Sequence, residues 1–328
     1  MTKEDTVTKE MVRAKVQFAS GGDTCAAWHY RGTSGACVVM AGGFAVTKEA
    51  ATDAFASRFQ QAGFSVLAFD YRRLGESGGQ PRLVLPVRDQ LADWHAAISF
   101  ASTLPEVDAA KIAVWGFSAS GGHVLRVAAG HPAVAAVIAQ SPNADGLAAA
   151  RNQSRHQRVG AMLRFTGRGA LDAIGGVVGR PPRLVPLSGK PGTVAVLTTP
   201  DAQDAGLALN PDHRYPDWQQ QVAARSALRL AWYSPGRAAR RVRCPLLVLV
   251  CDQDQSALAG PAIRVAKRAP RGELVRLAGG HYHPFLAGHE ASVEAELGFL
   301  RRHLLPRAGE SPAPALRRGR EHAPGPFG

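Results

Sequence analysis

One serine has neighbours that suit covalent catalysis. The segment VWGFSASGG at 114–122 places Gly116, Ser118 and Ser120 at alternate positions. An apolar strand leads into the segment and a helix of small residues follows, which is the strand–turn–helix context of a G-x-S-x-G nucleophile elbow. The sharp turn needs small residues two positions before and after the serine, and Gly116 and Ser120 both qualify. We predict that Ser118 is a nucleophile; a glycine-rich turn with an incidental serine is the alternative.

A serine hydroxyl is a weak nucleophile until a base takes its proton. Behind a nucleophile elbow the chain order is serine, acid, histidine. The apolar stretch ELVRLAGG is followed by His281 and, two residues later, by His283. We assign the base to His281, which comes directly after the glycines at a strand end, and keep His283 as the alternative.

The acid that orients this histidine should follow another strand end. The strand PLLVLV is followed by Asp252 and Asp254. Asp254 lies further beyond the strand end and is better placed to reach an imidazole, so we favour it over Asp252. Asp145 is a more remote candidate. The acid would hold the histidine tautomer and stabilise its cation.

An acyl-transfer reaction also needs backbone amides aimed at the developing oxyanion. One amide should come from Ala119, directly after the nucleophile and at the positive end of its helix. The second should come from the loop AGGF at 41–44, where glycines allow close approach to a substrate. We predict that Phe44 is that donor; a plain tight turn is the alternative.

Other residues that could do chemistry are given structural roles. His123 is expected to pack or hydrogen-bond behind the nucleophile, Trp115 to lie in the core, and Trp94 to belong to an amphipathic helix. Arg72 and Glu76 are expected to pair and stabilise a loop beside the site.

These residues must be positioned by an alternation of strands and helices. Apolar, strand-length runs alternate with helical segments up to about residue 142 and again from about residue 244. Such alternation predicts a mostly parallel sheet with helices on both faces. We predict a core of residues 1–142 and 244–305, an inserted cap at 143–243, and a disordered tail at 306–328 that is rich in Pro, Gly and Arg.

With these motifs in place, the chain resembles the α/β-hydrolase superfamily. The resemblance rests on Ser118, Asp254 and His281 in their contexts and on FDYRRLGESGG at 69–79, which is similar to the family's D-x-R-G-x-G-x-S loop. The pattern is similar to the branch related to dienelactone hydrolases and X-Pro dipeptidyl-peptidases, which includes polyketide-associated acyl hydrolases and transferases. Two departures are Ala41, where relatives often have histidine, and Ser120 in place of glycine.

The resemblance and the residues together imply a serine hydrolase that cleaves an ester or thioester through an acyl-enzyme. An acyltransferase using the same residues is the alternative; a peptidase and a non-catalytic binding protein are weaker ones. No metal and no organic cofactor is expected. We expect a small-molecule acyl substrate, no nucleic-acid or membrane partner, and a homodimer as an open option.

Composition sets further bounds. The four cysteines show no CxxC pair, and Cys37 and Cys251 are expected to be buried free thiols, which favours a cytoplasmic location. The net charge is +13, and residues 151–243 hold 15 Arg and Lys against 5 Asp and Glu. We favour a solvated Arg-rich surface slightly, with an anionic substrate such as an acyl-CoA or an acyl carrier protein as the functional alternative.

Overall fold

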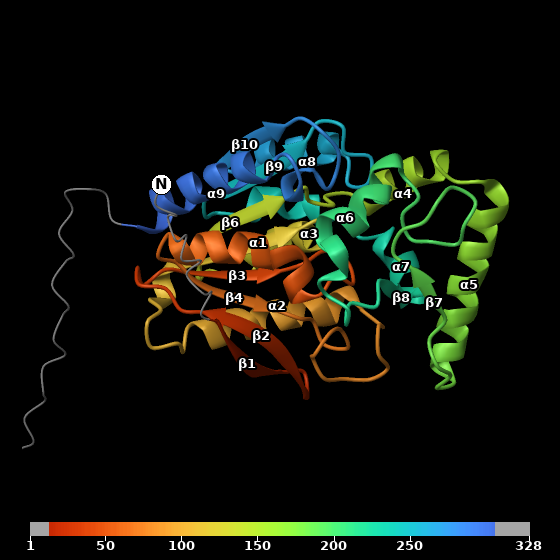
Figure 1. Cartoon of the computed structure of the whole chain (residues 1–328), viewed down its shortest axis with the longest axis horizontal. Coiled ribbons are helices and arrows are strands. Elements are labelled where there is room, and N and C mark those ends of the chain that lie inside the picture. Colours follow the sequence, from red (N-terminus) through yellow and green to blue (C-terminus); the bar gives the residue numbers. More distant parts are fainter. Residues whose placement is uncertain (1–12, 306–328) are drawn as a thin grey trace, which may run out of the picture.

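The computed structural model describes residues 13–305, and an eight-stranded sheet runs through them (Figure 1). The sheet has the order β1-β2-β4-β3-β5-β6-β9-β10. Its strands are β1 (Arg13–Ser20), β2 (Asp23–Tyr30), β3 (Cys37–Ala41), β4 (Ser65–Phe69), β5 (Ile112–Phe117), β6 (Val134–Gln140), β9 (Leu246–Cys251) and β10 (Gly272–Leu277). The tail at 306–328, predicted to be disordered, lies outside the described residues.

All neighbouring strands from β4 to β10 pair in parallel, whereas β2 is antiparallel to both β1 and β4. The predicted mostly parallel sheet is therefore confirmed. Because parallel strands end at the same edge, the loops that follow β3, β5, β9 and β10 meet there.

Helices cover both faces of the sheet. Helices α1 (Lys48–Gln61) and α9 (His289–Leu304) pack on one face in a cluster that includes Phe55 and Trp115. Helices α2 (Val87–Ala101), α3 (Ala119–Ala128) and α8 (Ala259–Arg268) pack on the other face in a cluster that includes Trp94. Strands β3, β5 and β9 are buried along their whole length, which explains their uninterrupted apolar sequences.

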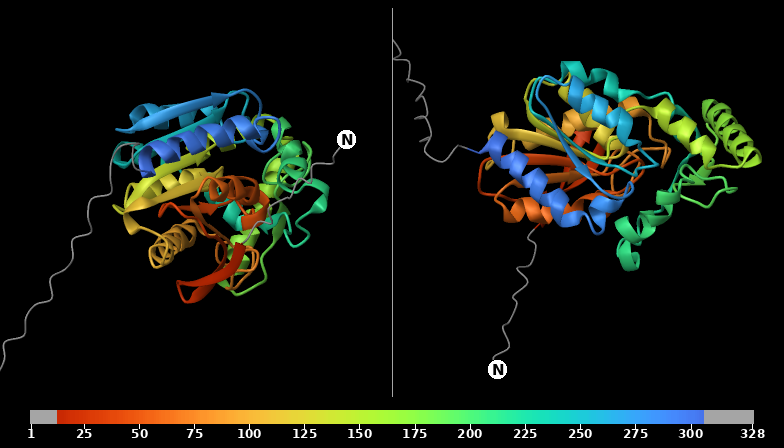
Figure 2. Two further views of the ribbon diagram at one scale, coloured as in Figure 1. Left: turned by 60° about the vertical axis from the view of Figure 1, so that its left-hand side comes forward. Right: turned by 90° about the horizontal axis from the view of Figure 1, so that it is seen from above.

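A group of elements between β6 and β9 lies beside the eight-stranded sheet (Figure 2). It contains α4 (Gly146–Arg155), α5 (Val159–Val177), β7 (Leu184–Pro186), α6 (Ala205–Leu209), β8 (Gln221–Ala223) and α7 (Ala224–Leu230). Five 3-10 helices occur in the described chain: η1 (Ala109–Lys111), η2 (Pro200–Asp204), η3 (Pro211–His213), η4 (Pro235–Arg241) and η5 (His283–Phe285). The segment returns to the core at η4, whose buried Ala239 belongs to the same cluster as Trp94.

Cys37 and Cys251 are buried free thiols, as predicted. Within residues 13–305 we find no helix with both the length and the apolar character needed to cross a bilayer. The described residues also contain no group of three or more His, Cys, Asp or Glu side chains that could hold a metal ion.

Candidate active site

Ser118 occupies a strained turn between β5 and α3. Its backbone angles are φ 57° and ψ −115°, a conformation that a side chain rarely adopts. A Cβ atom at Gly116 would lie 2.3 Å from the carbonyl oxygen of Ser120, so position 116 has room only for glycine. The turn is held by a hydrogen bond from the Ser118 amide to the Gln140 carbonyl on β6 (3.0 Å). The local geometry is that of a nucleophile elbow.

Two further side chains form a hydrogen-bonded chain with this serine. The Nε2 atom of His281 lies 3.0 Å from Ser118 Oγ, and its Nδ1 atom lies 2.7 Å from Asp254 Oδ2. His281 and Asp254 are both buried, and they follow β10 and β9 respectively. Three loops far apart in sequence therefore bring together a hydroxyl, an imidazole and a carboxylate.

The alternatives considered from sequence lie elsewhere. Asp252 is exposed and pairs with Arg276 on β10 at 2.8 Å. Asp145 accepts a hydrogen bond from the Ala148 amide and caps α4. The ring of His283 lies against Gly279 and Gly288, where added Cβ atoms would meet it. None of these groups is hydrogen-bonded to His281 in the described structure.

The electrostatics around His281 favour its charged form. Burial lowers the pKa of His281, but the charge and hydrogen bond of Asp254, with the charge of Asp201, outweigh burial and leave the pKa raised above its ordinary value. His281 would thus hold a proton taken from Ser118 more readily than an isolated buried imidazole. Asp254 is fixed in turn, because its Oδ1 atom accepts from the amides of Ser256 (2.9 Å) and Ala257 (2.6 Å).

The loop after β3 lies beside the elbow. Ala41 pairs with Gly116 across β3 and β5, and a Cβ atom on Gly43 would lie 3.4 Å from the Ser118 Cβ. Phe44 and Ala119 line the same small cavity as Ser118. The Ala119 amide belongs to the first turn of α3, where helices leave their N–H groups without intrahelical partners.

Ser120, the departure from glycine, connects the elbow to that loop. Its hydroxyl donates to the Gly42 carbonyl and lies 2.5 Å from the Tyr71 hydroxyl, which accepts from Trp94 Nε1 at 2.8 Å. Because Ser120 donates to Gly42, Tyr71 must donate to Ser120. The motif alone could not reveal this chain of hydrogen bonds, since its members lie on four separate segments.

The expected pair between Arg72 and Glu76 is wrong. Arg72 pairs with the buried Asp93 on α2 at 2.5 Å. Glu76 instead contacts Lys15 and Lys48, whose Nζ also lies 2.9 Å from Asp70 Oδ2. Asp93 is buried on α2, whereas Glu76 is half-exposed. The Arg72 side chain extends towards α2 and therefore pairs with Asp93 rather than with Glu76, although Glu76 is only four residues away in the sequence. By contrast His123 is buried and hydrogen-bonded to Tyr233, as predicted.

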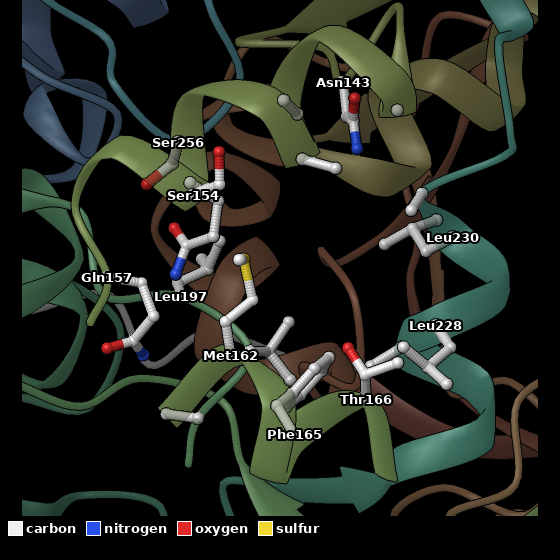
Figure 3. A pocket seen from close by; sticks show the side chains of 18 residues that line it. Asn143, Ser154, Gln157, Met162, Phe165, Thr166, Leu197, Leu228, Leu230 and Ser256 are labelled. Atoms are coloured by element: carbon white, nitrogen blue, oxygen red, sulfur yellow. The ribbon is translucent and has the colours of Figure 1, made fainter. Parts of the chain in front are cut away.

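Two cavities near the elbow share part of their lining. The smaller, of about 70 Å³, is lined by Ser118 with Phe44, Ala119 and Trp218 among others. The larger, of about 290 Å³, lies between α4, α5 and α7 (Figure 3). Five residues line both cavities: Asn143, Val196, Leu197, Leu230 and Ser256. None of the residues lining either cavity is charged.

Sequence reasoning missed one acidic residue at this site. Asp201, in the η2 turn, is buried and accepts hydrogen bonds from the backbone of His281 and of Gln255. It lies in the segment TTPDAQD, which has no strand end or motif that would mark it.

Comparison with known proteins agrees with this geometry. The family model described as "X-Pro dipeptidyl-peptidase (S15 family)" matches residues 23–282. The "Quorum-quenching protein AidA" of Acinetobacter baumannii is 38% identical over 292 residues, which are 88% of this chain and 94% of that protein. A "Thiohydrolase" of Eupenicillium brefeldianum is 30% identical over 217 residues, 66% of this chain and 65% of that protein.

The solved structures give the same architecture. The α/β hydrolase GrgF from Penicillium sp. sh18 superposes with a TM-score of 0.74 at 23% identity, covering 89% of this chain and 99% of that one. This likeness shows the fold, and the family match extends over most of the described residues. The chain therefore belongs to the X-Pro dipeptidyl-peptidase (S15) family of α/β hydrolases.

Proposed function

We propose that the protein is a serine hydrolase that cleaves an ester or thioester bond through an acyl-enzyme formed on Ser118. The observation that carries this proposal is the hydrogen-bonded chain Ser118–His281–Asp254, with distances of 3.0 and 2.7 Å, whose serine lines an uncharged cavity. Nucleophile, base and orienting acid in this arrangement are the parts that acyl transfer requires.

The reaction has two halves. Ser118 Oγ attacks the substrate carbonyl carbon while His281 Nε2 takes the hydroxyl proton. The amides of Phe44 and Ala119 hold the oxyanion of the tetrahedral intermediate. As the intermediate collapses, His281 returns the proton to the leaving alcohol or thiol, and the acyl group stays on Ser118. His281 then activates a water molecule that releases the acid, while Asp254 stabilises the imidazolium in both halves.

The lining of the cavities supports an apolar acyl group, which is the part of the substrate that would remain bound to Ser118 in the acyl-enzyme. Residues 143–243 form a cap over the carboxyl ends of the strands, and the larger cavity lies within it. Its lining combines aliphatic side chains such as Leu228 with a few neutral polar ones such as Gln157 (Figure 3). An apolar chain would bury its surface there without leaving a charge unpaired.

The same acyl-enzyme could pass its acyl group to an alcohol or amine. Relatives include a "Polyketide transferase ATR5" that is 39% identical over 137 residues, so transfer is the second candidate function. A peptidase is disfavoured despite the family's description. Among the described residues that line the two cavities there is no Asp or Glu to pair with a peptide amino terminus.

The charge of the cap supports an anionic carrier on its outer surface. Arg151, Arg155 and Arg158 are exposed, and none of them lines either of the two cavities described above. The acyl chain would enter the neutral cavity while a phosphate-rich or acidic carrier, such as coenzyme A or an acyl carrier protein, stayed outside against these arginines.

A homodimer would be formed through the outer face of α5. Val159, Leu163, Leu171, Ile174 and Val177 are all more than half exposed and recur at intervals of three to eight residues along this helix. In Figure 1, α5 lies at the edge of the molecule farthest from the sheet. An uncharged stripe is self-complementary across a two-fold axis, whereas an acidic partner would be matched by the arginines instead.

A labelling and turnover experiment tests the function. A fluorophosphonate should label Ser118, and Ser118→Ala should abolish labelling and reduce kcat by several orders of magnitude. Turnover of acyl p-nitrophenyl esters and acyl-CoA thioesters of graded length should show a length optimum. Adding an alcohol separates the two candidates, because a transferase would form the new ester in preference to the free acid. Labelling of Ser77 or Ser120, or no turnover of any acyl substrate, would contradict the proposal.

A further inference from the structure

Asp201 lies at the junction between the cap and the proposed catalytic residues. It sits in η2, and its side chain reaches the loops that follow β9 and β10. Its Oδ2 atom accepts from the amides of Gln255 (2.8 Å), Ser256 (3.3 Å) and His281 (3.2 Å). Its Oδ1 atom accepts from the Ser256 hydroxyl at 2.8 Å.

These donors belong to two different loops. Gln255 and Ser256 follow Asp254 directly, whereas the third amide is that of His281 itself. A single carboxylate from a third segment therefore fixes the acid and the base relative to one another. Only an ionised carboxylate offers two acceptor atoms for four such donors.

The surrounding residues leave space for this contact. A Cβ atom at Gly280 would lie 2.9 Å from the Asp201 Cβ, so a larger residue before His281 would displace the carboxylate. The glycines that marked His281 in the sequence are therefore explained in part by Asp201.

We propose that Asp201 is a positioning residue that locks the loops of Asp254 and His281 together and places a second negative charge beside the imidazolium. The inference rests on the proposed function of Ser118. It assigns to the cap segment a direct part in organising the proposed catalytic residues, in addition to covering the substrate.

The charges around the site agree with this role. Burial raises the pKa of Asp201, but the charge of His281 and the hydrogen bonds outweigh it and hold the pKa below its ordinary value, so Asp201 is ionised at neutral pH. The groups that face His281 are Ser118, Asp254, Asp201, and the rings of Phe117 and Tyr282. Tyr282 is neutral because burial raises its pKa. Asp201 is thus the second of two anions acting on His281.

The pH dependence of Ser118 labelling by a fluorophosphonate tests the proposal without a known substrate. Labelling requires neutral His281, so the labelling rate should rise as the pH increases through the raised pKa of His281. In Asp201→Asn, loss of one charge lowers that pKa, so the midpoint should move to lower pH by about 0.5–1 unit. The maximal labelling rate should fall by roughly 10- to 100-fold because the two loops lose their common anchor.

Two variants separate charge from structure. Asp204→Asn removes an exposed carboxylate from the same turn and should keep the wild-type midpoint and rate. Asp201→Glu keeps the charge but displaces it, so the rate should fall while the midpoint stays. A shifted midpoint in Asp201→Glu, or wild-type labelling in Asp201→Asn, would overturn the role of Asp201. Failure of the wild-type protein to be labelled at Ser118 would instead overturn the proposed function.

Discussion

At the scale of single residues, the environment of each acid distinguishes candidates that the sequence could only rank. Asp252 and Asp254 lie two positions apart after the same strand. Asp254 turns inward to His281 and receives two backbone amides, whereas Asp252 turns outward to Arg276. A buried anion is tolerated only where its hydrogen bonds are satisfied, and Asp254 meets that condition.

Substitution of the two acids should therefore have unequal effects. Asp254→Asn should reduce kcat by about 10³- to 10⁴-fold, because an amide stabilises the wrong histidine tautomer. Asp252→Asn is the matched control, removing the same charge two residues away, and should change kcat less than about twofold. Steady-state rates on one activated ester measure both. The reverse ranking would move the acid to position 252 and contradict the geometry.

At the scale of elements, helix α5 presents apolar side chains in two directions. Its inward face carries Met162 and Phe165, which line the larger cavity opposite Leu228 of α7. Its outward face carries the exposed stripe that includes Leu163 and Ile174. Apolar residues on the two sides of α5 are thus divided between a cavity wall and an exposed surface.

The inward face should set the length of acyl chain that is accepted. Met162→Trp fills the cavity, so the optimum in a series of p-nitrophenyl esters should shift to shorter chains. Phe165→Ala enlarges it and should shift the optimum to longer chains. Leu207→Trp, on an exposed position of α6, serves as the control and should leave the optimum unchanged. If the chain-length optimum were the same in both cavity variants as in the wild type, the acyl chain would bind elsewhere.

At the scale of the whole molecule, the positive charge and the cavities are separated. Arg151, Arg155 and Arg158 are exposed, while the cavity next to Ser118 is lined by uncharged residues. Charge can therefore influence how a substrate arrives more than how its acyl group is held.

The dependence of kcat/KM on ionic strength tests this separation. For an acyl-CoA, kcat/KM should fall steeply as ionic strength rises to 0.15 M, where the Debye length is about 8 Å, while a neutral ester of equal acyl length stays flat. Arg151→Gln/Arg155→Gln should weaken the salt dependence. Arg301→Gln/Arg302→Gln, at the end of α9, removes equal charge away from the cap and should not. Parallel curves for the two substrates would leave the arginines as a solvated surface.

The exposed stripe of α5 predicts the oligomeric state. The wild-type protein should be a dimer by light scattering coupled to size-exclusion chromatography. The variant Leu163→Glu/Ile174→Glu should be a monomer, because dimerisation would bury two unpaired carboxylates from each subunit. Leu207→Glu is a control of matched exposure, 67% against 66% for Leu163, and should remain dimeric. A wild-type monomer at tens of micromolar would reject the interface.

The sequence by itself determined the sheet-and-helix core, the family resemblance and the identity of the candidate serine. Each depends on short-range information. Buried parallel strands need continuous apolar runs, and a nucleophile elbow needs small residues within five consecutive positions, here Gly116 to Ser120.

Only the tertiary structure decided which acid meets His281, that Arg72 pairs with Asp93 rather than Glu76, and that Asp201 joins the site. These contacts link residues 21 to 80 positions apart, and the choice among competing carboxylates depends on burial and on donors from other loops. The exposure of Arg151, Arg155 and Arg158 and the burial of Arg225 were equally hidden, because charge counts carry no information on which face a helix buries. Local patterns specify elements and their turns, whereas the partners of a polar side chain are specified by packing.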